Sequence, residues 1–250
     1  MKIARFLDGN EPRWAVWRNE KWVWMAGELF EDGFQETDAE VPAGLSYLPP
    51  CDSSKIVCVG LNYRDHIMEM KHEMPAEPVI FLKPPTAMVG NGGTIVIPHG
   101  ARRVDYEAEL AIVIGKTAKC VPVSEASEYI YGYTCLNDVT EREIQKRDGQ
   151  WTRAKGFDTF APIGPCVETE LDPENLEIRL LVNGVEHQHS NTSNFIFRID
   201  EIVSFVSGVM TLYPGDIIST GTPSGIGPLF SGDTVTVSIE GIGELTNRVK

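Results

Sequence analysis

Two glutamates, Glu107 and Glu109, stand two residues apart in a run, residues 105–115, that otherwise has the pattern of a buried β-strand. Alternate residues of a strand share a face, so both carboxylates are expected to point the same way. The residues from Leu110 to Ile114 are continuously apolar, which favours burial on both faces over the solvated face of an edge strand. Because burying two unpaired like charges is costly, a cation must lie between them, and a divalent metal ion is the simplest candidate.

The kind of metal follows from the residue types around this pair. No histidine or cysteine accompanies the two glutamates, so oxygen ligands and a hard ion such as Mg²⁺ are favoured over zinc. Mg²⁺ usually keeps several waters and completes its octahedron with substrate oxygens. Asp138, at an expected strand-to-helix junction, is suited to supply a third carboxylate. An aspartate in that place can equally be a helix cap, so spacing alone leaves both roles open.

Two further groups are suited to acid–base or electrostatic chemistry. His66 and Glu69 are three residues apart on an expected helix, so the carboxylate could orient the imidazole to take a proton from water. The same spacing is also typical of an exposed charge pair. Lys155 is flanked by aromatic and small residues, and it is either partly buried near the anionic site or an ordinary surface lysine.

The glycine-rich segment at residues 221–227 superficially resembles a phosphate-binding loop. It lacks the Gly-Lys-Ser/Thr ending of such loops, and no helix signal follows it. We therefore expect a tight turn that lines a pocket, and not a nucleotide site.

The elements that must position these groups are mostly short strands. Residues 1–50 are rich in tryptophan and end in two prolines, which predicts a small N-terminal β-rich unit before a catalytic domain over residues 51–250. Strands are expected at residues 56–60, 79–82, 94–97, 105–114, 216–219 and 234–239. Helices are expected at residues 62–73, at 124–131, from the capping box Thr140-x-x-Glu143 to Gly149, and at 201–212 with Asp200 as N-cap. The predicted fold class is mostly β with short helices (α+β), and not a doubly wound β-α-β series.

Composition limits the class of protein. With 250 residues and 42% hydrophobic content, the chain can bury an ordinary globular core. The formal net charge of −14 argues against nucleic-acid binding. The five cysteines form no C-x-x-C pair, which favours free, mostly buried thiols. No signal-peptide core occurs, and no apolar run approaches the roughly 20 residues of a membrane span, so a soluble cytoplasmic protein is expected.

Several segments together resemble the fumarylacetoacetate hydrolase family, from about Lys55 to Val249. The segments are Gly60-Leu61-Asn62-Tyr63-Arg64-Asp65-His66, Phe81-Leu82-Lys83-Pro84, Asp105-Tyr106-Glu107-Ala108-Glu109-Leu110, Asn137-Asp138, Lys155-Gly156-Phe157-Asp158-Thr159-Phe160 and Gly221-Thr222-Pro223. The resemblance implies the mixed β-roll fold of that family and a homodimer. The short N-terminal region favours the branch of acylpyruvases and 2-hydroxyhepta-2,4-diene-1,7-dioate isomerases.

The resemblance also implies roles for single residues. The ligands of Mg²⁺ or Mn²⁺ would be Glu107, Glu109 and Asp138. The catalytic residues would be His66 and Glu69, which activate water, and Lys155 beside the metal. The residues that hold the carboxylate and oxo oxygens of the substrate would be Arg142, Gln145 and Thr192. Two further histidines, possible determinants of specificity or surface residues, are His187 and His189.

The function implied is that of a Mg²⁺-dependent enzyme acting on 2-oxo and 2,4-dioxo acids through a metal-bound enolate. The first hypothesis is hydrolytic C–C bond cleavage of an acylpyruvate-type substrate, a small anion. Isomerisation or decarboxylation of a hydroxymuconate-type diacid, and decarboxylation or tautomerisation of oxaloacetate, pass through the same kind of enolate and stay open. A non-catalytic protein that keeps the fold is disfavoured, because the expected ligands, dyad and lysine are all present.

Overall fold

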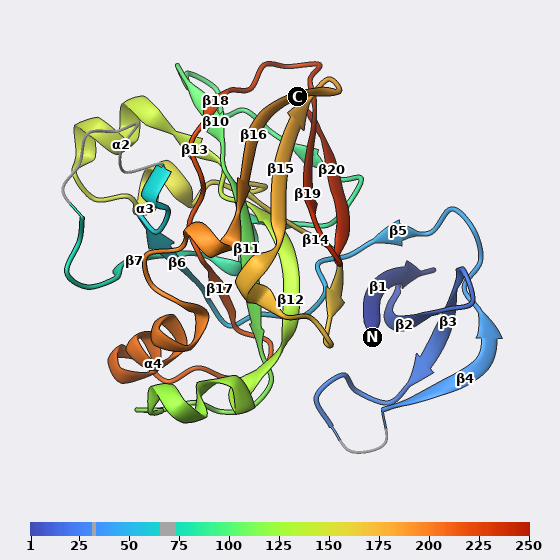
Figure 1. The fold of residues 1–250 in the computed structure, drawn as a ribbon. Helices are drawn as coiled ribbons and strands as arrows, with labels where there is room; N and C mark the ends of the chain where they lie inside the picture. The colour runs from blue at the N-terminus through green and yellow to red at the C-terminus, as the bar shows by residue number, and fades with distance from the viewer. Residues whose placement is uncertain (32–33, 66–73) are drawn as a thin grey trace.

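The structure, a computed structural model, describes residues 1–31, 34–65 and 74–250. Strands dominate this part of the chain and its helices are short, so the predicted fold class is confirmed (Figure 1). None of the helices in this part has the length and apolar sequence needed to cross a membrane. All five cysteines are free thiols and four of them are buried, as expected.

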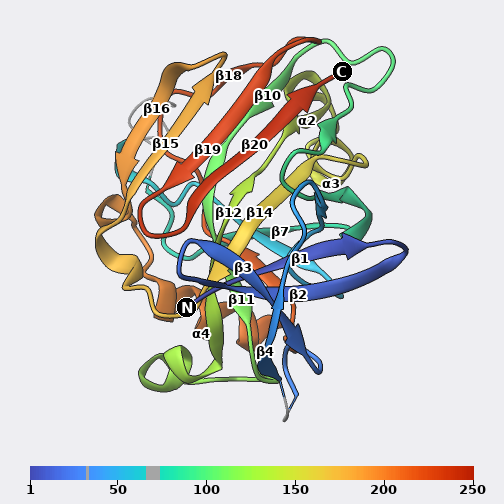
Figure 2. The ribbon, with the colours of Figure 1, turned by 90° about the vertical axis from the view of Figure 1, so that its right-hand side faces the viewer.

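The N-terminal residues form a small antiparallel meander. Its strands are β1 (Lys2–Asp8), β2 (Glu11–Arg18), β3 (Lys21–Ala26), β4 (Gln35–Glu40) and the short β5 (Ser46–Tyr47). Phe6 on β1 packs edge-on against Trp22 and Trp24 of β3, with ring centroids 5.7 and 6.1 Å apart, so the tryptophans build the small core of this unit. Because β1 also pairs with β14 (Ala161–Glu168), the meander extends the main sheet (Figure 1, Figure 2).

The largest sheet has twelve strands among the described residues. Beside β1 to β5 and β14, it contains β6 (Ile56–Gly60), β7 (Val79–Lys83), β8 (Met88–Val89), β11 (Ala108–Ile114), β12 (Ile130–Asn137) and β17 (Ile217–Ser219). The order along its main path is β4-β3-β2-β1-β14-β12-β11-β17-β6-β7. Every residue of β11 is buried, as its apolar run predicted, because the strand is central and covered on both faces.

A five-stranded sheet packs on this large sheet. Its order is β16 (Val185–Asn191), β15 (Glu177–Val182), β19 (Thr234–Ile239), β20 (Gly243–Val249) and β9 (Thr94–Ile95). Every second residue of β15 and β19 is buried, so one face of the sheet joins Leu110 and Ile112 of β11 in the core. In Figure 2, β19 and β20 pass in front of β12 and β14, which they contact. A third, small sheet has the order β13 (Thr140–Glu141), β10 (Val104–Tyr106) and β18 (Gly227–Pro228).

The helices differ in detail from the sequence predictions. The α-helices described are α2 (Arg142–Asp148), α3 (Thr152–Lys155) and α4 (Ile199–Val209). The 3₁₀ helices are η1 (Pro85–Ala87), η2 (Val123–Tyr129), η3 (Pro173–Asn175) and η4 (Thr192–Asn194). The helix expected at 124–131 is therefore the 3₁₀ helix η2. The helix expected at 62–73 lies largely outside the described residues.

Two predicted helix caps were wrong. The N-cap of α2 is Glu141, whose carboxylate accepts the amide hydrogen of Ile144, whereas the Thr140 hydroxyl donates to the Asp138 carbonyl oxygen. The end at Gly149, in the left-handed region at φ 68°, was predicted correctly. In α4 the N-cap is Arg198, and Asp200 lies inside the first turn. In both cases the polar pattern predicted the presence of a helix start and missed its position by a residue or two.

Candidate metal centre

A break between two strands brings Glu107 and Glu109 together. The single strand expected over 105–114 was wrong, because β10 ends at Tyr106 in the small sheet and β11 begins at Ala108 in the large sheet. Side-chain amides bind the backbone at this break: Asn137 accepts the amide hydrogen of Glu107 at 2.9 Å, and Gln188 accepts that of Ala108 at 2.9 Å. The break is therefore a fixed feature whose polar groups are satisfied.

Three carboxylates converge beside the break. Glu107, Glu109 and Asp138 are 5, 2 and 1% exposed, and they offer one oxygen each within 4.8 Å of one another. Asp138 follows the end of β12, and its backbone amide donates to the Glu107 carbonyl oxygen at 2.8 Å. Since Glu141 caps α2, Asp138 is free of the capping role that the sequence left open. The three carboxylates that the sequence analysis singled out therefore lie together in the fold.

Two buried lysines neutralise part of this cluster. The Nζ of Lys155, at the end of α3, donates to Glu107 Oε2 at 2.8 Å and to Asp138 Oδ2 at 2.6 Å. The Nζ of Lys83, the last residue of β7, donates to Asp138 Oδ1 and to the Val139 carbonyl oxygen. Figure 1 shows α3 near β7, which brings both ammonium groups to one carboxylate. Lys155 is therefore buried at the anionic site and is no surface lysine.

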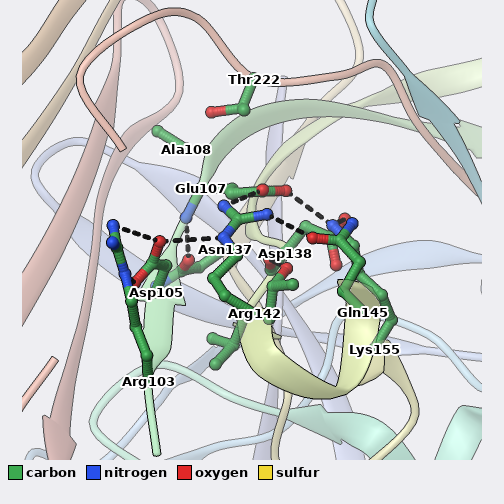
Figure 3. Close-up of polar contacts among 12 residues, drawn as sticks. Arg103, Asp105, Glu107, Ala108, Asn137, Asp138, Arg142, Gln145, Lys155 and Thr222 are labelled. Carbon is green, nitrogen blue, oxygen red and sulfur yellow. Dashed lines mark hydrogen bonds and ion pairs between the residues drawn. The ribbon is translucent and has the colours of Figure 1, made fainter. Parts of the chain in front are cut away.

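Arg142 links the carboxylates to the rim of the site. Its guanidinium donates to Glu107, to Asp105 Oδ2 at 2.9 Å and to Gln145 Oε1 at 3.0 Å (Figure 3). Arg142 and Gln145 are one turn apart on α2, so this helix presents both side chains to the same place. Arg103 binds the far side of Asp105 at 2.8 and 3.1 Å. The structure thus places two of the three expected substrate-binding residues beside the carboxylates.

Glu109 is held from the opposite side by the last residue of β17 and the segment that follows it. Its Oε2 accepts the Ser219 hydroxyl at 2.5 Å and the Gly221 amide at 2.9 Å. Gly221 has a φ of 96°, and a Cβ there would lie 2.9 Å from the Cβ of Asn62, so only glycine brings its amide this close. The other carboxylate oxygen, Glu109 Oε1, accepts no hydrogen bond from the described part of the chain.

Burial and charge shift two pKa values in the cluster. Burial, with the charges of Asp138 and Glu107 added, raises the pKa of Glu109 to about 8. Burial disfavours the charged form of Lys155, but the Asp138 and Glu107 carboxylates outweigh it and raise the pKa of this lysine above its ordinary value. Lys155 therefore stays an ammonium ion at neutral pH, while Glu109 forms no ion pair with another described residue.

The donor set fits a hard divalent ion. All three residues offer carboxylate oxygens, which Mg²⁺ and Mn²⁺ prefer, and Glu109 has an oxygen without a partner among the described residues. The raised pKa of Glu109 also favours a metal site here, because a cation bound beside this carboxylate would stabilise its charged form and lower that pKa. These three residues are thus the ones that could hold such an ion.

The raised pKa of Glu109 predicts how the metal-free protein responds to pH. Between pH 4.5 and about 8 the folded chain holds a proton on Glu109 that the unfolded chain has lost. The free energy of unfolding should therefore fall as pH rises through this window, by up to about 1.4 kcal/mol per pH unit from this group. Urea unfolding in EDTA at several pH values measures the slope. The variant Glu109→Gln should lose this contribution, and an identical slope in the variant would contradict the assignment.

Of the remaining residues named from the sequence, those that the structure describes are not in the cluster. Thr192 is buried in η4, where its hydroxyl oxygen accepts the Leu176 amide at 2.8 Å, and no hydrogen bond between described residues connects it to the carboxylates. His189 is exposed and contacts Glu177 and Glu186. The ring of His187, also exposed, lies 5.9 Å from that of Tyr106. His66 and Glu69 lie outside the described residues.

Sequence reasoning assigned no role to several residues that the structure brings to the site. Among them are Lys83, Gln188, Ser219 and Thr222. Lys83 and Thr222 belong to segments that carried the family resemblance, so a signal for them was present. Residues 221–226 form a loop with a bend at Ser224 that leads into β18. Thr222 lies over Glu107 and Ala108 in Figure 3, and Gln188 links it to Ala108.

The fold and these groups define a β-rich protein with a buried centre of carboxylates and lysines suited to a hard divalent ion. The chain belongs to the fumarylacetoacetate hydrolase family, because the family described as fumarylacetoacetate (FAA) hydrolase C-terminal matches residues 55–250. A second family, described as Rv2993c-like, N-terminal, matches residues 1–44. The resemblance drawn from the sequence is confirmed, and the protein is an enzyme of this family. The division into units at residue 50 stays a prediction.

Three relatives illustrate what the chain is similar to. It is 47% identical over 198 residues to oxaloacetate tautomerase FAHD1, mitochondrial, of Arabidopsis thaliana, with 77% of this chain and 89% of that protein covered. A structure of 2-hydroxyhepta-2,4-diene-1,7-dioate isomerase from Mycobacterium marinum is 45% identical, with a TM-score of 0.91 over 100% of this chain and 98% of that one. A fumarylacetoacetate hydrolase from psychrophilic Exiguobacterium antarcticum is 35% identical, with a TM-score of 0.88 over 100% and 99%. The names describe three reactions, so family membership leaves the reaction open.

Proposed function

We propose that the protein is a Mg²⁺- or Mn²⁺-dependent enzyme that acts on 2-oxo and 2,4-dioxo acids, and that it hydrolyses a C–C bond of an acylpyruvate-type substrate. The observation that carries the proposal is the buried cluster of Glu107, Glu109 and Asp138, with Lys155 bound to two of its members. Bound to these carboxylates, a divalent ion would supply Lewis-acid stabilisation of negative charge on the 2-oxo oxygen of the substrate.

Local charge supports an anionic substrate despite the acidic composition. Among the described residues, the carboxylates of the site are Asp105, Glu107, Glu109 and Asp138, and the cationic groups are Lys83, Arg103, Arg142 and Lys155. The two sets are equal in number, so a divalent ion would leave the site positive. A 2-oxo acid, whose reaction gains a second negative charge as the enolate forms, suits such a site.

The lysine and the residues of α2 have separate tasks in this proposal. Lys155 stays charged and therefore cannot accept a proton; it stabilises the oxygen on which the enolate charge develops. Arg142 and Gln145 lie at the partly exposed edge of the site and hold the substrate carboxylate. We leave Thr192 out, because no hydrogen bond between described residues connects it to the carboxylates.

Hydrolysis needs a base in addition to these charged groups. We assign it to His66, oriented by Glu69, on the strength of their spacing and of the family motif, since both lie outside the described residues. Water that loses its proton to His66 adds to C4 of the 2,4-dioxo acid, and the C3–C4 bond breaks. The bonding electrons pass to C3 and O2 as the pyruvate enolate, and the acyl fragment leaves as a carboxylic acid that releases its proton to solvent. The proton that His66 took from water passes to C3 of the enolate, which gives pyruvate and restores the base.

His66→Ala should separate hydrolysis from enolisation. Only hydrolysis requires an activated water, so cleavage of acetylpyruvate should fall by about 100-fold or more. Keto–enol exchange of oxaloacetate in the same preparation should fall less. Both rates can be followed through the enol absorbance, with pyruvate formation as a second readout of cleavage. Equal losses in both reactions would contradict this division of tasks.

Tautomerisation of oxaloacetate is a second candidate, favoured by the name of the Arabidopsis relative. The deciding experiment incubates purified protein with Mg²⁺ and either acetylpyruvate or oxaloacetate, and follows loss of the enol together with pyruvate production. Pyruvate from acetylpyruvate supports the hydrolase. A response of oxaloacetate alone supports a tautomerase or decarboxylase, which pyruvate formation distinguishes. If neither substrate responds, a hydroxymuconate-type diacid is tested next, as the name of the Mycobacterium marinum relative suggests.

The expected homodimer and cytoplasmic location stay predictions.

A further inference from the structure

Gln188 is a buried polar residue on an otherwise open strand. It is 0% exposed, whereas its neighbours on β16 are mostly exposed or half-buried. Its Oε1 accepts the Ala108 amide at 2.9 Å, between the two glutamates of the metal centre. Its Nε2 donates to Thr222 Oγ1 at 2.9 Å and to the Pro223 and Ser224 carbonyl oxygens at 2.9 and 3.4 Å. One side chain therefore joins the strand break to the loop after β17.

The partners of Gln188 fix the orientation of its amide. Oε1 faces a backbone N–H group, which can only donate, so that atom must be the acceptor. Nε2 faces two carbonyl oxygens, which can only accept, so it must be the donor. Exchanging oxygen and nitrogen would set like dipoles against each other at three contacts. The orientation thus follows from obligatory donors and acceptors.

This orientation determines the direction of the Thr222 proton. Because Thr222 Oγ1 faces an amide N–H group, its oxygen accepts and its own hydrogen must point elsewhere. The residue is 5% exposed, and its hydroxyl donates to no acceptor in the described part of the chain. Figure 3 shows Thr222 over Glu107 and Ala108. A hydrogen-bond donor without a protein partner among the described residues therefore lies above the carboxylates.

We propose that Gln188 is a positioning residue: it orients the Thr222 hydroxyl as a donor toward the anionic substrate, and it ties the substrate-facing loop to the strand break that holds the metal ligands. The anionic substrate rests on the proposed function. The hydrogen bonds that carry the proposal do not depend on it. The donor complements the positive groups on the α2 side, so a carboxylate or oxo oxygen is held from both directions.

Gln188→Glu is the sharpest variant, because it keeps the size and the acceptor but removes the donor. The introduced carboxylate still accepts the Ala108 amide. It also accepts the Thr222 proton, so the hydroxyl turns its lone pairs toward the site and repels an anion. Oxalate serves as the probe, since it is a small dicarboxylate that resembles a 2-oxo acid. In the variant, the dissociation constant of oxalate from the Mn²⁺-loaded protein should rise by about 10-fold to 100-fold. The dissociation constant of Mn²⁺ should change by less than about 3-fold.

A double-mutant cycle shows whether the effect passes through Thr222. Thr222→Val removes the donor and should weaken oxalate binding about as much as Gln188→Glu, whereas Thr222→Ser should keep it. In the Thr222→Val background, Gln188→Glu should add little, because the hydroxyl it would turn is gone. Glu186→Gln, an exposed change two residues away on β16, is the matched control and should bind oxalate like the unmodified protein.

The outcomes separate this proposal from the proposed function. If the unmodified Mn²⁺-loaded protein binds neither oxalate nor acetylpyruvate, the proposed function fails. If it binds them and Gln188→Glu binds them equally well, the positioning role is contradicted. Additive losses in the double variant, or a parallel loss of Mn²⁺ affinity, would show a general structural role and also contradict it. Should Gln188→Glu fail to fold, unchanged oxalate binding in Thr222→Val would still overturn the proposal.

Discussion

Glu109→Gln should leave the protein folded and lower its Mg²⁺-dependent activity by at least about 100-fold. The variant keeps the shape of the side chain and an oxygen that can accept the Ser219 hydroxyl and the Gly221 amide. Folding should not suffer, because the raised pKa of Glu109 already favours its neutral form in the metal-free protein at neutral pH. The loss should arise because a neutral amide is a poor ligand for a hard divalent ion beside two carboxylates.

Two measurements test this prediction. Isothermal titration with Mn²⁺ should show weakened or absent binding in Glu109→Gln, and the activity assay should show the corresponding loss. Glu125→Gln makes the same chemical change at an exposed glutamate in η2 and should retain both properties. Full activity in Glu109→Gln, or metal affinity equal to that of the unmodified protein, would remove Glu109 from the ligand set.

Lys155→Met should lower kcat by about 100-fold to 1,000-fold, the range seen when one preorganised donor to an oxyanion is removed. The same variant should destabilise the metal-free protein by about 3–5 kcal/mol, because it leaves Glu107 and Asp138 without the ammonium they share. Mg²⁺ should restore much of that stability, since the ion would neutralise the same carboxylates. The loss of kcat and the loss of stability have different causes. Mg²⁺ should restore the stability but not the kcat.

Urea unfolding in EDTA and in Mg²⁺, together with steady-state kinetics, measures both effects. Lys146→Met is the matched control, because the Lys146 side chain is 74% exposed and lies 3.9 Å from the Glu143 carboxylate. It should change neither kcat nor stability appreciably. If Lys155→Met kept its kcat once Mg²⁺ had restored folding, Lys155 would be a structural counter-ion and not a catalytic group.

The sequence is most informative where charged residues occur in a segment that is otherwise expected to be buried. Two glutamates in an apolar run demand a cation, and that requirement alone singles out Glu107 and Glu109. The same pattern misleads about the backbone, because its alternation predicts one continuous strand. The strand breaks at Glu107, where the chain passes from one sheet to another, and the amides of Asn137 and Gln188 take the place of ladder partners.

The site residues that the sequence did not predict are held by contacts between residues far apart in the chain. Lys83 meets Asp138 across 55 residues, and Gln188 meets Ala108 across 80, so neither pairing leaves a periodic signal in the chain. Thr192 shows the opposite case: its place in the family pattern suggests a substrate contact, whereas in the fold its hydroxyl oxygen accepts the Leu176 amide. Strand positions were predicted well where burial alternates, as in Thr234–Ile239, because one face must enter the core.

The central claim, that Glu107, Glu109 and Asp138 hold a catalytic divalent ion, is tested most directly by metal content and activity in one preparation. Protein stripped with EDTA is titrated with Mn²⁺, and acetylpyruvate and oxaloacetate turnover are measured at each step. We expect one Mn²⁺ bound per chain, activity that rises in proportion to occupancy, and loss of both in Glu109→Gln. Turnover that is undiminished in EDTA, or Mn²⁺ binding that survives in Glu109→Gln, would contradict the claim.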